Sequence, residues 1–116
     1  MAFTPKWTPA ALDQYEKLRR RAVEAKQARE RSGKTKSSKA EGLFKQVAAC
    51  IGKLLANPKH PGLHTHEYTG IEHPFSDKEK VWEAYAQNDT PGAYRVFWCY
   101  GPQRREITIL AITPHP

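Results

Sequence analysis

Histidine is the residue type whose spacing in this sequence most directly suggests chemistry. Five histidines occur, at positions 60, 64, 66, 73 and 115, and the segment His64-Thr65-His66 falls on a predicted strand, where both rings share one face. Three interpretations are open for this pair: acid–base catalysis, a metal site, and exposed side chains beside a turn. The metal site is the least favoured, because no third ligand follows at a suitable spacing. We therefore predict no metal and no other cofactor.

Arg95 is the second candidate, because it is a lone charge inside the apolar segment AYRVFWCY. Such a segment predicts a central strand, and with helices on the opposite face Arg95 would lie on the uncovered face of the sheet. There a fixed guanidinium can hold a phosphate in a bidentate manner and stabilise charge that develops on it. The alternative is an internal ion pair with Glu83 or Glu67. His115, in the segment TPHP, follows directly after another predicted strand.

The positive charge of the chain is concentrated in its first half. Residues 1–59 carry fourteen Lys and Arg against five Asp and Glu, whereas residues 60–116 carry five against seven. Ten basic residues lie between Lys17 and Lys39, opposed only by Glu24 and Glu30. Such a surface attracts polyanions such as RNA or DNA, or an acidic protein partner, although a solvated helix face would show the same pattern.

The elements that position these residues follow from periodicity and capping signals. Thr8-Pro9 predicts the start of a helix, and Ser32-Gly33 and Asn57-Pro58 each predict the end of one. The two helical segments that these signals delimit each carry an apolar face. The expected order is a strand at 3–7, helices at 9–32 and 39–56, and strands at 63–69, 81–86, 93–100 and 106–113. The predicted class is α+β, with an N-terminal strand, a two-helix hairpin and an antiparallel meander, and with the helices packed on one face of the sheet.

Length and composition limit the remaining possibilities. A chain of 116 residues suits a single domain over 1–116, in which 25–42 would be a basic interhelical segment, extended or flexible. The longest apolar run, Val47 to Ile51, is too short to cross a bilayer, so we expect no membrane association. The N-terminus has no pattern of a secretory signal, and two isolated cysteines are typical of a reducing compartment. Cys50, Cys99, Trp98 and Leu110 are expected in the core, and the protein in the cytoplasm.

Four segments together resemble the RelE/ParE toxin superfamily of bacterial toxin–antitoxin systems. They are LLANPKHPGLHTHEYTG, VWEAYA, AYRVFWCYG and ITILAITPHP, and the resemblance covers the chain in order, most specifically from Leu54 to Pro116. It implies a ribosome-dependent endoribonuclease, closest to the RelE-like members with a C-terminal histidine. These cleave messenger RNA without metal, with the 2′-hydroxyl as nucleophile. The implied partners are a cognate antitoxin protein and messenger RNA in the A site of the 30S ribosomal subunit.

The resemblance also implies roles for individual residues. Arg95 matches a strand arginine that contacts the scissile phosphate, and His115 matches a histidine that acts as general acid after the last strand. His64 and His66 lie where other members place a base or a phosphate-binding residue, and a one-residue slip in register exchanges the one that faces the site. Glu67 is a further candidate base.

RNA-binding residues are expected among basic and aromatic side chains: Lys59, His60, Arg19, Arg20, Lys34, Lys36, Trp82 and Phe97. Trp82 and Phe97 would stack on bases, because prolines flank His115 where many members carry an aromatic residue. The superfamily also contains gyrase-directed toxins. Two alternatives therefore remain: a non-catalytic toxin of the same fold that inhibits DNA gyrase or another target, and an inert or repurposed member.

Overall fold

Two helices, a short 3-10 turn and five strands make up the part of the chain that the computed structural model describes, residues 2–88 and 90–115. In chain order they are β1 (Thr4–Trp7), α1 (Pro9–Arg31), α2 (Lys39–Ala56), the 3-10 turn η1 (Pro61–Leu63), β2 (His66–Glu67), β3 (Trp82–Tyr85), β4 (Tyr94–Tyr100) and β5 (Glu106–Pro114). Neither helix in these ranges combines the length and the apolar character that crossing a membrane requires.

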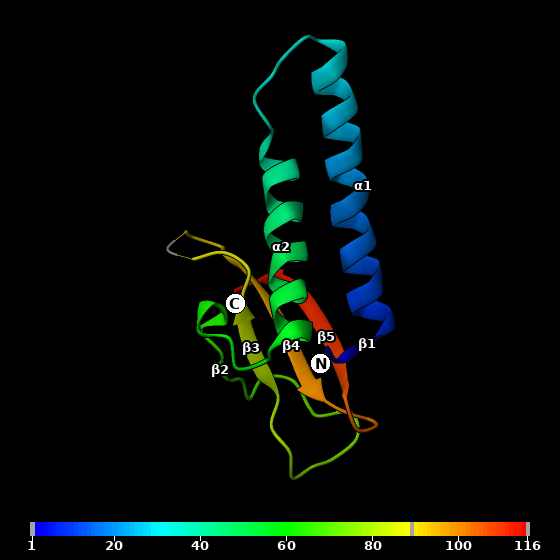
Figure 1. The fold of residues 1–116 in the computed structure, drawn as a ribbon, viewed down its shortest axis with the longest axis vertical. Coiled ribbons are helices and arrows are strands. Elements are labelled where there is room, and N and C mark those ends of the chain that lie inside the picture. The colour runs from blue at the N-terminus through cyan, green and yellow to red at the C-terminus, as the bar shows by residue number, and fades with distance from the viewer. Residues whose placement is uncertain (1, 89, 116) are drawn as a thin grey trace.

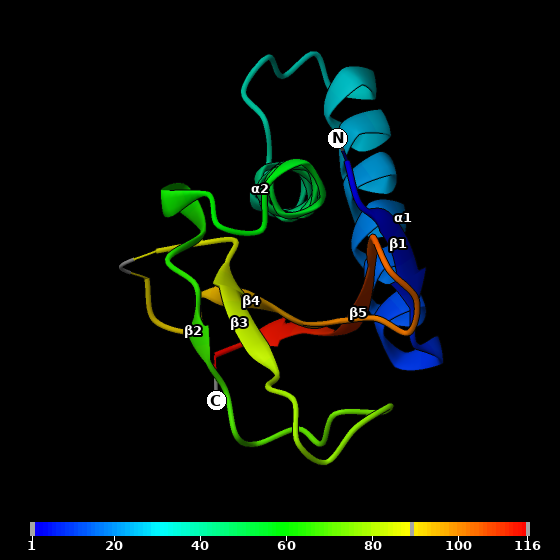
Figure 2. The same ribbon diagram turned by 60° about the horizontal axis from the view of Figure 1, so that its bottom comes forward.

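The strands form one mixed sheet in the order β1-β5-β4-β3-β2. The edge strand β1 runs parallel to β5, and the other neighbours are antiparallel. Both helices cover one face of this sheet, and the long loop between β2 and β3 lies on the other side, as Figure 1 and Figure 2 show. The predicted α+β architecture, with its N-terminal edge strand, helical hairpin and meander, is confirmed.

Side-chain caps define where the helices begin, as the sequence predicts for α1. The hydroxyl of Thr8 accepts a hydrogen bond from the backbone N–H of Ala11 and donates one to the carbonyl of Leu110, which ties the start of α1 to β5. At the start of α2, Ser38 and Glu41 form a reciprocal capping box. Each cap fixes a helix end relative to its surroundings, so the two helices enter the fold at defined positions.

The outer part of the helical hairpin projects beyond the sheet (Figure 1) and is closed by an ion pair. Arg29 donates from Nε and Nη2 to the carboxylate of Glu41 at 2.9–3.2 Å. The Arg29 guanidinium, followed by the backbone N–H of Ser38, lowers the pKa of Glu41 to about 2. Within 25–42 the structure thus has helix to Arg31, a short turn and loop, and helix again from Lys39.

The main core lies between the helices and the sheet. Its buried members are Ala11, Leu18, Val47, Cys50, Ile51, Leu54, Leu63, Ala84, Val96, Trp98, Ile107, Ile109 and Ile112. A smaller cluster on the other face joins Val81, Phe97, Cys99 and Leu110 beneath the loop between β2 and β3. Burial raises the pKa of the Cys50 thiol to about 12 and that of Cys99 to about 11. The predicted core positions of both cysteines, Trp98 and Leu110 are confirmed.

One predicted strand is wrong over most of its length. The segment 63–69 pairs with β3 only at His66 and Glu67, whereas Leu63 ends the 3-10 turn and is buried beneath α2. His64 then adopts a left-handed conformation, with φ 49°, which turns the chain toward the sheet edge. Beyond the two pairs, the Tyr68 N–H still donates to the carbonyl of Val81 at 2.9 Å. The apolar pattern of the segment therefore reflects one buried anchor, Leu63, and a short stretch of pairing.

Candidate active site

A buried carboxylate, that of Glu83, organises the face of the sheet opposite the helices. Glu83 lies in the middle of β3 and is only 1% exposed. One oxygen, Oε1, is 3.1 Å from Arg95 Nε and 3.0 Å from His115 Nδ1, and the other, Oε2, is 3.4 Å from His66 Nε2. A charge at this depth requires partners, and these three side chains supply them. We call this group, with Tyr85, the Glu83 cluster.

Arg95 lies on the predicted face of β4 but is 7% exposed, so it is buried rather than presented to solvent. Its Nε donates to Glu83, its Nη1 donates to the carbonyls of Gln87 at 2.6 Å and Tyr94 at 3.3 Å, and its Cζ lies 3.6 Å from the centre of the Tyr85 ring. The predicted alternative, an internal ion pair with Glu83, is therefore present. Among residues 2–88 and 90–115 no hydrogen bond to Nη2 occurs, so this nitrogen is available to an anion.

His64 and His66 meet on the ring of Tyr85. Each imidazole centroid is 5.4 Å from that of Tyr85, so both rings approach the same aromatic side chain. Only His66 faces the carboxylate of Glu83, and its Nδ1 is 3.0 Å from the carbonyl of His64. Both ring nitrogens of His66 thus face oxygen atoms, which hold this imidazole between His64 and Glu83. His64 is exposed, and its ring is not hydrogen-bonded to any described residue.

His115 reaches the cluster from the end of β5. Its backbone N–H donates to the carbonyl of Ala93 at 2.8 Å, which continues the pairing of β5 with β4 by one residue. This backbone bond directs the side chain, 48% exposed, toward Glu83. Because Nδ1 faces the carboxylate, a proton is favoured on Nδ1 and the lone pair of the neutral ring lies on Nε2. No described residue contacts Nε2, so it is free to exchange a proton with a bound molecule.

The Glu83 cluster therefore combines a buried charged centre with a titratable edge. Glu83 and Arg95 are buried, whereas the side chains of His66 and His115 are half-exposed on the same face. The carboxylate orients the imidazole of His115, and the guanidinium adds a fixed positive charge beside it. Such an arrangement can bind an anionic group and transfer a proton. In the described part of the chain, no three His, Cys, Asp or Glu side chains are placed to hold a metal ion.

Two residues expected in the site lie elsewhere. Glu67 pairs in register with Trp82, which faces the helices, and its carboxylate is 3.7 Å from Lys80. The structure therefore does not bring Glu67 to the Glu83 cluster, because neighbouring residues of a strand point to opposite faces. The expectation that Phe97 stacks on a base is wrong, because Phe97 is 2% exposed and packs against Tyr68 with ring centres 4.6 Å apart.

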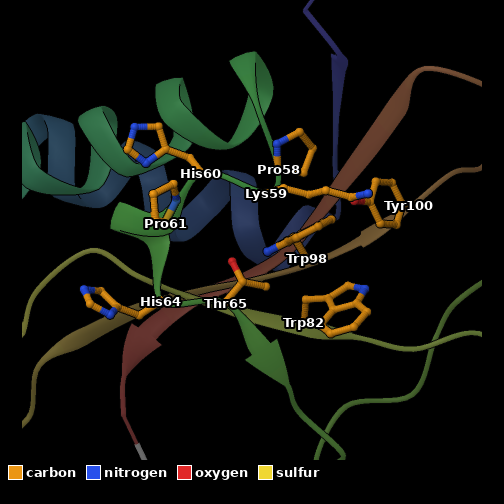
Figure 3. A pocket seen from close by; sticks show the side chains of 9 residues that line it. All are labelled: Pro58, Lys59, His60, Pro61, His64, Thr65, Trp82, Trp98 and Tyr100. Carbon is orange, nitrogen blue, oxygen red and sulfur yellow. The ribbon is translucent and has the colours of Figure 1, made fainter.

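The other expected RNA-binding residues fall into two groups. Lys59, His60 and Trp82 line a cavity on the helix side of the sheet (Figure 3). The four basic residues expected from the charge pattern belong to the helical hairpin: Arg19, Arg20, Lys34 and Lys36. All four are exposed, and Lys34 and Lys36 lie in the loop at the hairpin tip, away from the sheet (Figure 1).

Glu83 is the central residue of the site, and the sequence alone suggested it only as an ion-pair partner. A signal for a larger role exists, because Glu83 is a lone charge between apolar neighbours in VWEAYA, as Arg95 is in AYRVFWCY. Two lone charges of opposite sign on adjacent buried strands predict that they face one another. The convergence of both histidines on the same carboxylate needs the three-dimensional register.

Comparisons with known proteins identify the fold. No protein-family model and no curated protein matches the sequence. Three solved structures are similar to this chain. One is a YoeB/ParE toxin from Agrobacterium tumefaciens, with 12% sequence identity and a TM-score of 0.61. The others are an archaeal RelE–RelB complex from Pyrococcus horikoshii OT3, with 13% identity and a TM-score of 0.56, and a YoeB dimer from Staphylococcus aureus, with 8% identity and a TM-score of 0.57. The matches cover 97%, 98% and 100% of this chain and 99%, 96% and 100% of those chains, respectively. The chain therefore has the RelE/ParE-like toxin fold.

Proposed function

We propose that this protein is the toxin of a toxin–antitoxin system and that it cleaves messenger RNA on the ribosome without a metal ion. The fold, similar to that of YoeB and RelE proteins, supports the toxin assignment. The observation that carries the cleavage proposal is the convergence of Arg95 and His115 on the buried Glu83. It places a fixed cation next to an imidazole with a free nitrogen, as phosphoryl transfer requires.

The proposed reaction is an internal transfer at one phosphodiester. The ribose 2′-oxygen attacks the adjacent phosphorus, and the bond from phosphorus to the 5′-oxygen of the next nucleotide breaks. A base removes the 2′-hydroxyl proton, and an acid supplies a proton to the leaving 5′-oxygen. The products are a 2′,3′-cyclic phosphate and a 5′-hydroxyl end, so the reaction consumes no water and changes no oxidation state.

The described contacts favour particular roles in this reaction. His115 is the acid in its doubly protonated form, in which Nδ1 donates to Glu83 and Nε2 carries the proton that the leaving 5′-oxygen receives. His64 is the better candidate for the base, since both ring nitrogens of His66 already face oxygen atoms. Arg95 contributes Nη2 and its positive charge to the phosphate oxygens. Glu83 and His66 are positioning residues that hold these groups without touching the substrate.

The partner that follows from this proposal is an antitoxin protein. One of the similar structures is a RelE–RelB complex. The hairpin of this chain exposes a dense set of cations, and an acidic segment laid along it would neutralise them. Because the Glu83 cluster opens on the face opposite the helices, such a segment would have to extend past the hairpin to cover the site as well.

The test is induced expression in a bacterium, with mapping of new messenger 5′ ends and of their chemistry. Wild type should arrest growth and produce 5′-hydroxyl ends within translated reading frames. His115→Ala should reduce cleavage by a factor of about 10² to 10⁴, the range for loss of a general acid, and Arg95→Lys by about 10². Lys45→Gln, an exposed change on α2 outside the site, is the matched control and should behave as wild type.

Each result separates the proposal from its alternatives. Cuts that disappear in His115→Ala but persist in Lys45→Gln support the nuclease. Growth arrest without cuts would overturn the cleavage chemistry and direct attention to gyrase or another target. Soluble protein without arrest would overturn the toxin assignment. Cuts outside translated reading frames would contradict the dependence on the ribosome.

A further inference from the structure

The cavity on the helix side of the sheet, which Lys59, His60 and Trp82 help to line, has a volume of about 430 Å³ (Figure 3). It is enclosed by the segment that follows α2, by the turn η1 and by the ends of β3 and β4. The lining includes three aromatic residues, Trp82, Trp98 and Tyr100, and three polar ones, Lys59, His60 and Thr65. This volume falls within the range of small-molecule sites.

Three aromatic side chains line one side of the cavity. The rings of Trp82 and Trp98 are inclined by 29°, with centres 6.3 Å apart, and Tyr100 meets Trp98 edge-on with ring centres 4.9 Å apart. Trp82 is partly buried and Tyr100 is exposed, so both offer ring surface to a bound molecule. A planar ring is the ligand shape that gains most from such walls.

The floor of the cavity carries two polar atoms without a hydrogen bond in the described part of the chain. They are Nε1 of Trp98, a residue only 1% exposed, and the hydroxyl oxygen of Thr65. Figure 3 shows both atoms turned toward the same part of the cavity. An indole N–H can only donate, whereas a hydroxyl can donate or accept. A matching ligand therefore has an acceptor beside its ring, such as a base carbonyl or a ring nitrogen.

Two hydrogen-bond donors, the Lys59 ammonium and the His60 ring, stand at the mouth of the cavity. The Lys59 side chain is exposed and extends across the mouth toward Tyr100 (Figure 3). Its backbone is fixed, because its N–H donates to Asn57 Oδ1 at 3.1 Å. His60 Nδ1 accepts a hydrogen bond from Gly62, so the neutral ring carries its proton on Nε2 as a second donor. These groups suit an anionic substituent on the ligand.

We propose that this cavity binds one nucleotide unit, with the base against Trp82 and Tyr100, its acceptor atoms on Trp98 Nε1 and the Thr65 hydroxyl, and its phosphate at Lys59. The unit is either a free mononucleotide or one residue of a single-stranded RNA. The Trp82 and Glu83 side chains point to opposite faces of β3, so Glu83 lies across this strand from the cavity, and His64, the proposed base, lies at the boundary between the two. None of the side chains assigned here to the nucleotide belongs to the Glu83 cluster, so the inference does not require the cleavage chemistry.

The test is a titration of the purified chain, in which the NMR signals of the tryptophan indoles are monitored. The ligands are the four 5′-mononucleotides, the matching nucleosides and short oligoribonucleotides. We expect shifts of the Trp82 and Trp98 signals and no shift of Trp7, which lies in β1. Thr65→Val should weaken nucleotide binding about fivefold, the effect of one lost hydrogen bond, without lowering the unfolding midpoint. Lys59→Gln should weaken nucleotides about tenfold and leave nucleosides unchanged. Lys45→Gln is the control for charge.

The results of this titration distinguish the two nucleotide ligands and can also overturn the proposal. Equal affinity for a mononucleotide and an oligonucleotide identifies a free nucleotide as the ligand, whereas tenfold tighter oligonucleotide binding identifies an RNA strand. No shift of either indole at saturating nucleotide would overturn the proposal. Equal weakening of nucleosides and nucleotides by Lys59→Gln would overturn the phosphate position. The indole titration measures binding without cleavage, so a failure of this proposal is distinguishable from a failure of the proposed nuclease, which the mapping of messenger 5′ ends measures.

Discussion

Replacement of Glu83 by glutamine is the sharpest test of the buried charge at the centre of the site. Glu83→Gln keeps the shape and an oxygen for the Arg95 Nε, but it leaves the buried guanidinium without a counter-charge. Removal of one partner from a buried ion pair costs about 3–5 kcal/mol. The carbonyls of Gln87 and Tyr94 and the ring of Tyr85 still hold the guanidinium, so we expect the lower end, about 3 kcal/mol. For a chain of this size the melting temperature should fall by about 10 °C.

The measurement is urea unfolding, in which the midpoint should fall while the slope stays constant. Glu67→Gln is the matched control, because Glu67 pairs with Lys80 at 3.7 Å on the surface and its loss should change stability by at most about 1 kcal/mol. In a double-mutant cycle, the double variant Glu83→Gln, Arg95→Met should lose less free energy of unfolding than the two single variants lose together. The reason is that the double variant leaves no unpaired charge buried. A loss for Glu83→Gln no larger than that for Glu67→Gln would refute the reasoning.

Three further predictions follow from individual side chains. Arg29 lowers the pKa of Glu41 in the folded chain to about 2, so the unfolded chain takes up this proton first as the pH falls. The contribution of the Arg29–Glu41 pair to the free energy of unfolding is therefore complete above pH 4.5, the ordinary pKa of the carboxyl, and disappears as the pH falls toward about 2. Urea melts of wild type and Glu41→Gln should therefore converge over that interval, and a constant difference would contradict the assignment. The thiols of Cys50 and Cys99, with pKa raised to about 12 and about 11, should react with a thiol reagent at about pH 8 only as fast as the chain unfolds, so a rapid phase in native buffer would contradict their burial. Cleavage of RNA by the wild type should show a bell-shaped pH profile that loses its alkaline limb in His115→Ala, and a flat wild-type profile would contradict the acid–base scheme.

The fold was largely predictable because its local and long-range signals agree. Thr8-Pro9 and Ser32-Gly33 mark the ends of α1, and the apolar stripe of α2 matches the face that it buries. The strand expected over 63–69 was not predictable from its pattern. Its apolar anchor, Leu63, is buried by a 3-10 turn and not by a sheet, and a left-handed residue follows it. The spacing of apolar residues indicates which side chains are buried, but it does not distinguish a short turn from a short strand.

The site was predictable residue by residue but not as an arrangement. Arg95 was placed on the correct strand and face from its position among apolar residues. Its burial depends on Glu83, twelve positions earlier, and the distance between them is set by the register of the β3–β4 hairpin. Likewise, whether His64 or His66 faces the cluster depends on the left-handed turn at His64. Such long-range register is not determined by side-chain type and spacing in a single sequence.

The two interpretations of Arg95, structural ion pair and phosphate ligand, are compatible in this geometry. A purely structural pair needs only Glu83, Arg95 and the surrounding carbonyls, and it would be complete and closed to solvent. Here two half-exposed imidazoles, those of His66 and His115, contact the same carboxylate from the surface. Neither is needed to neutralise Glu83, because Arg95 already does so. Their presence connects the buried pair to solvent through two imidazoles, the side chains most often used as acid and base in catalysis, and that connection is what a site for proton transfer at a phosphate requires.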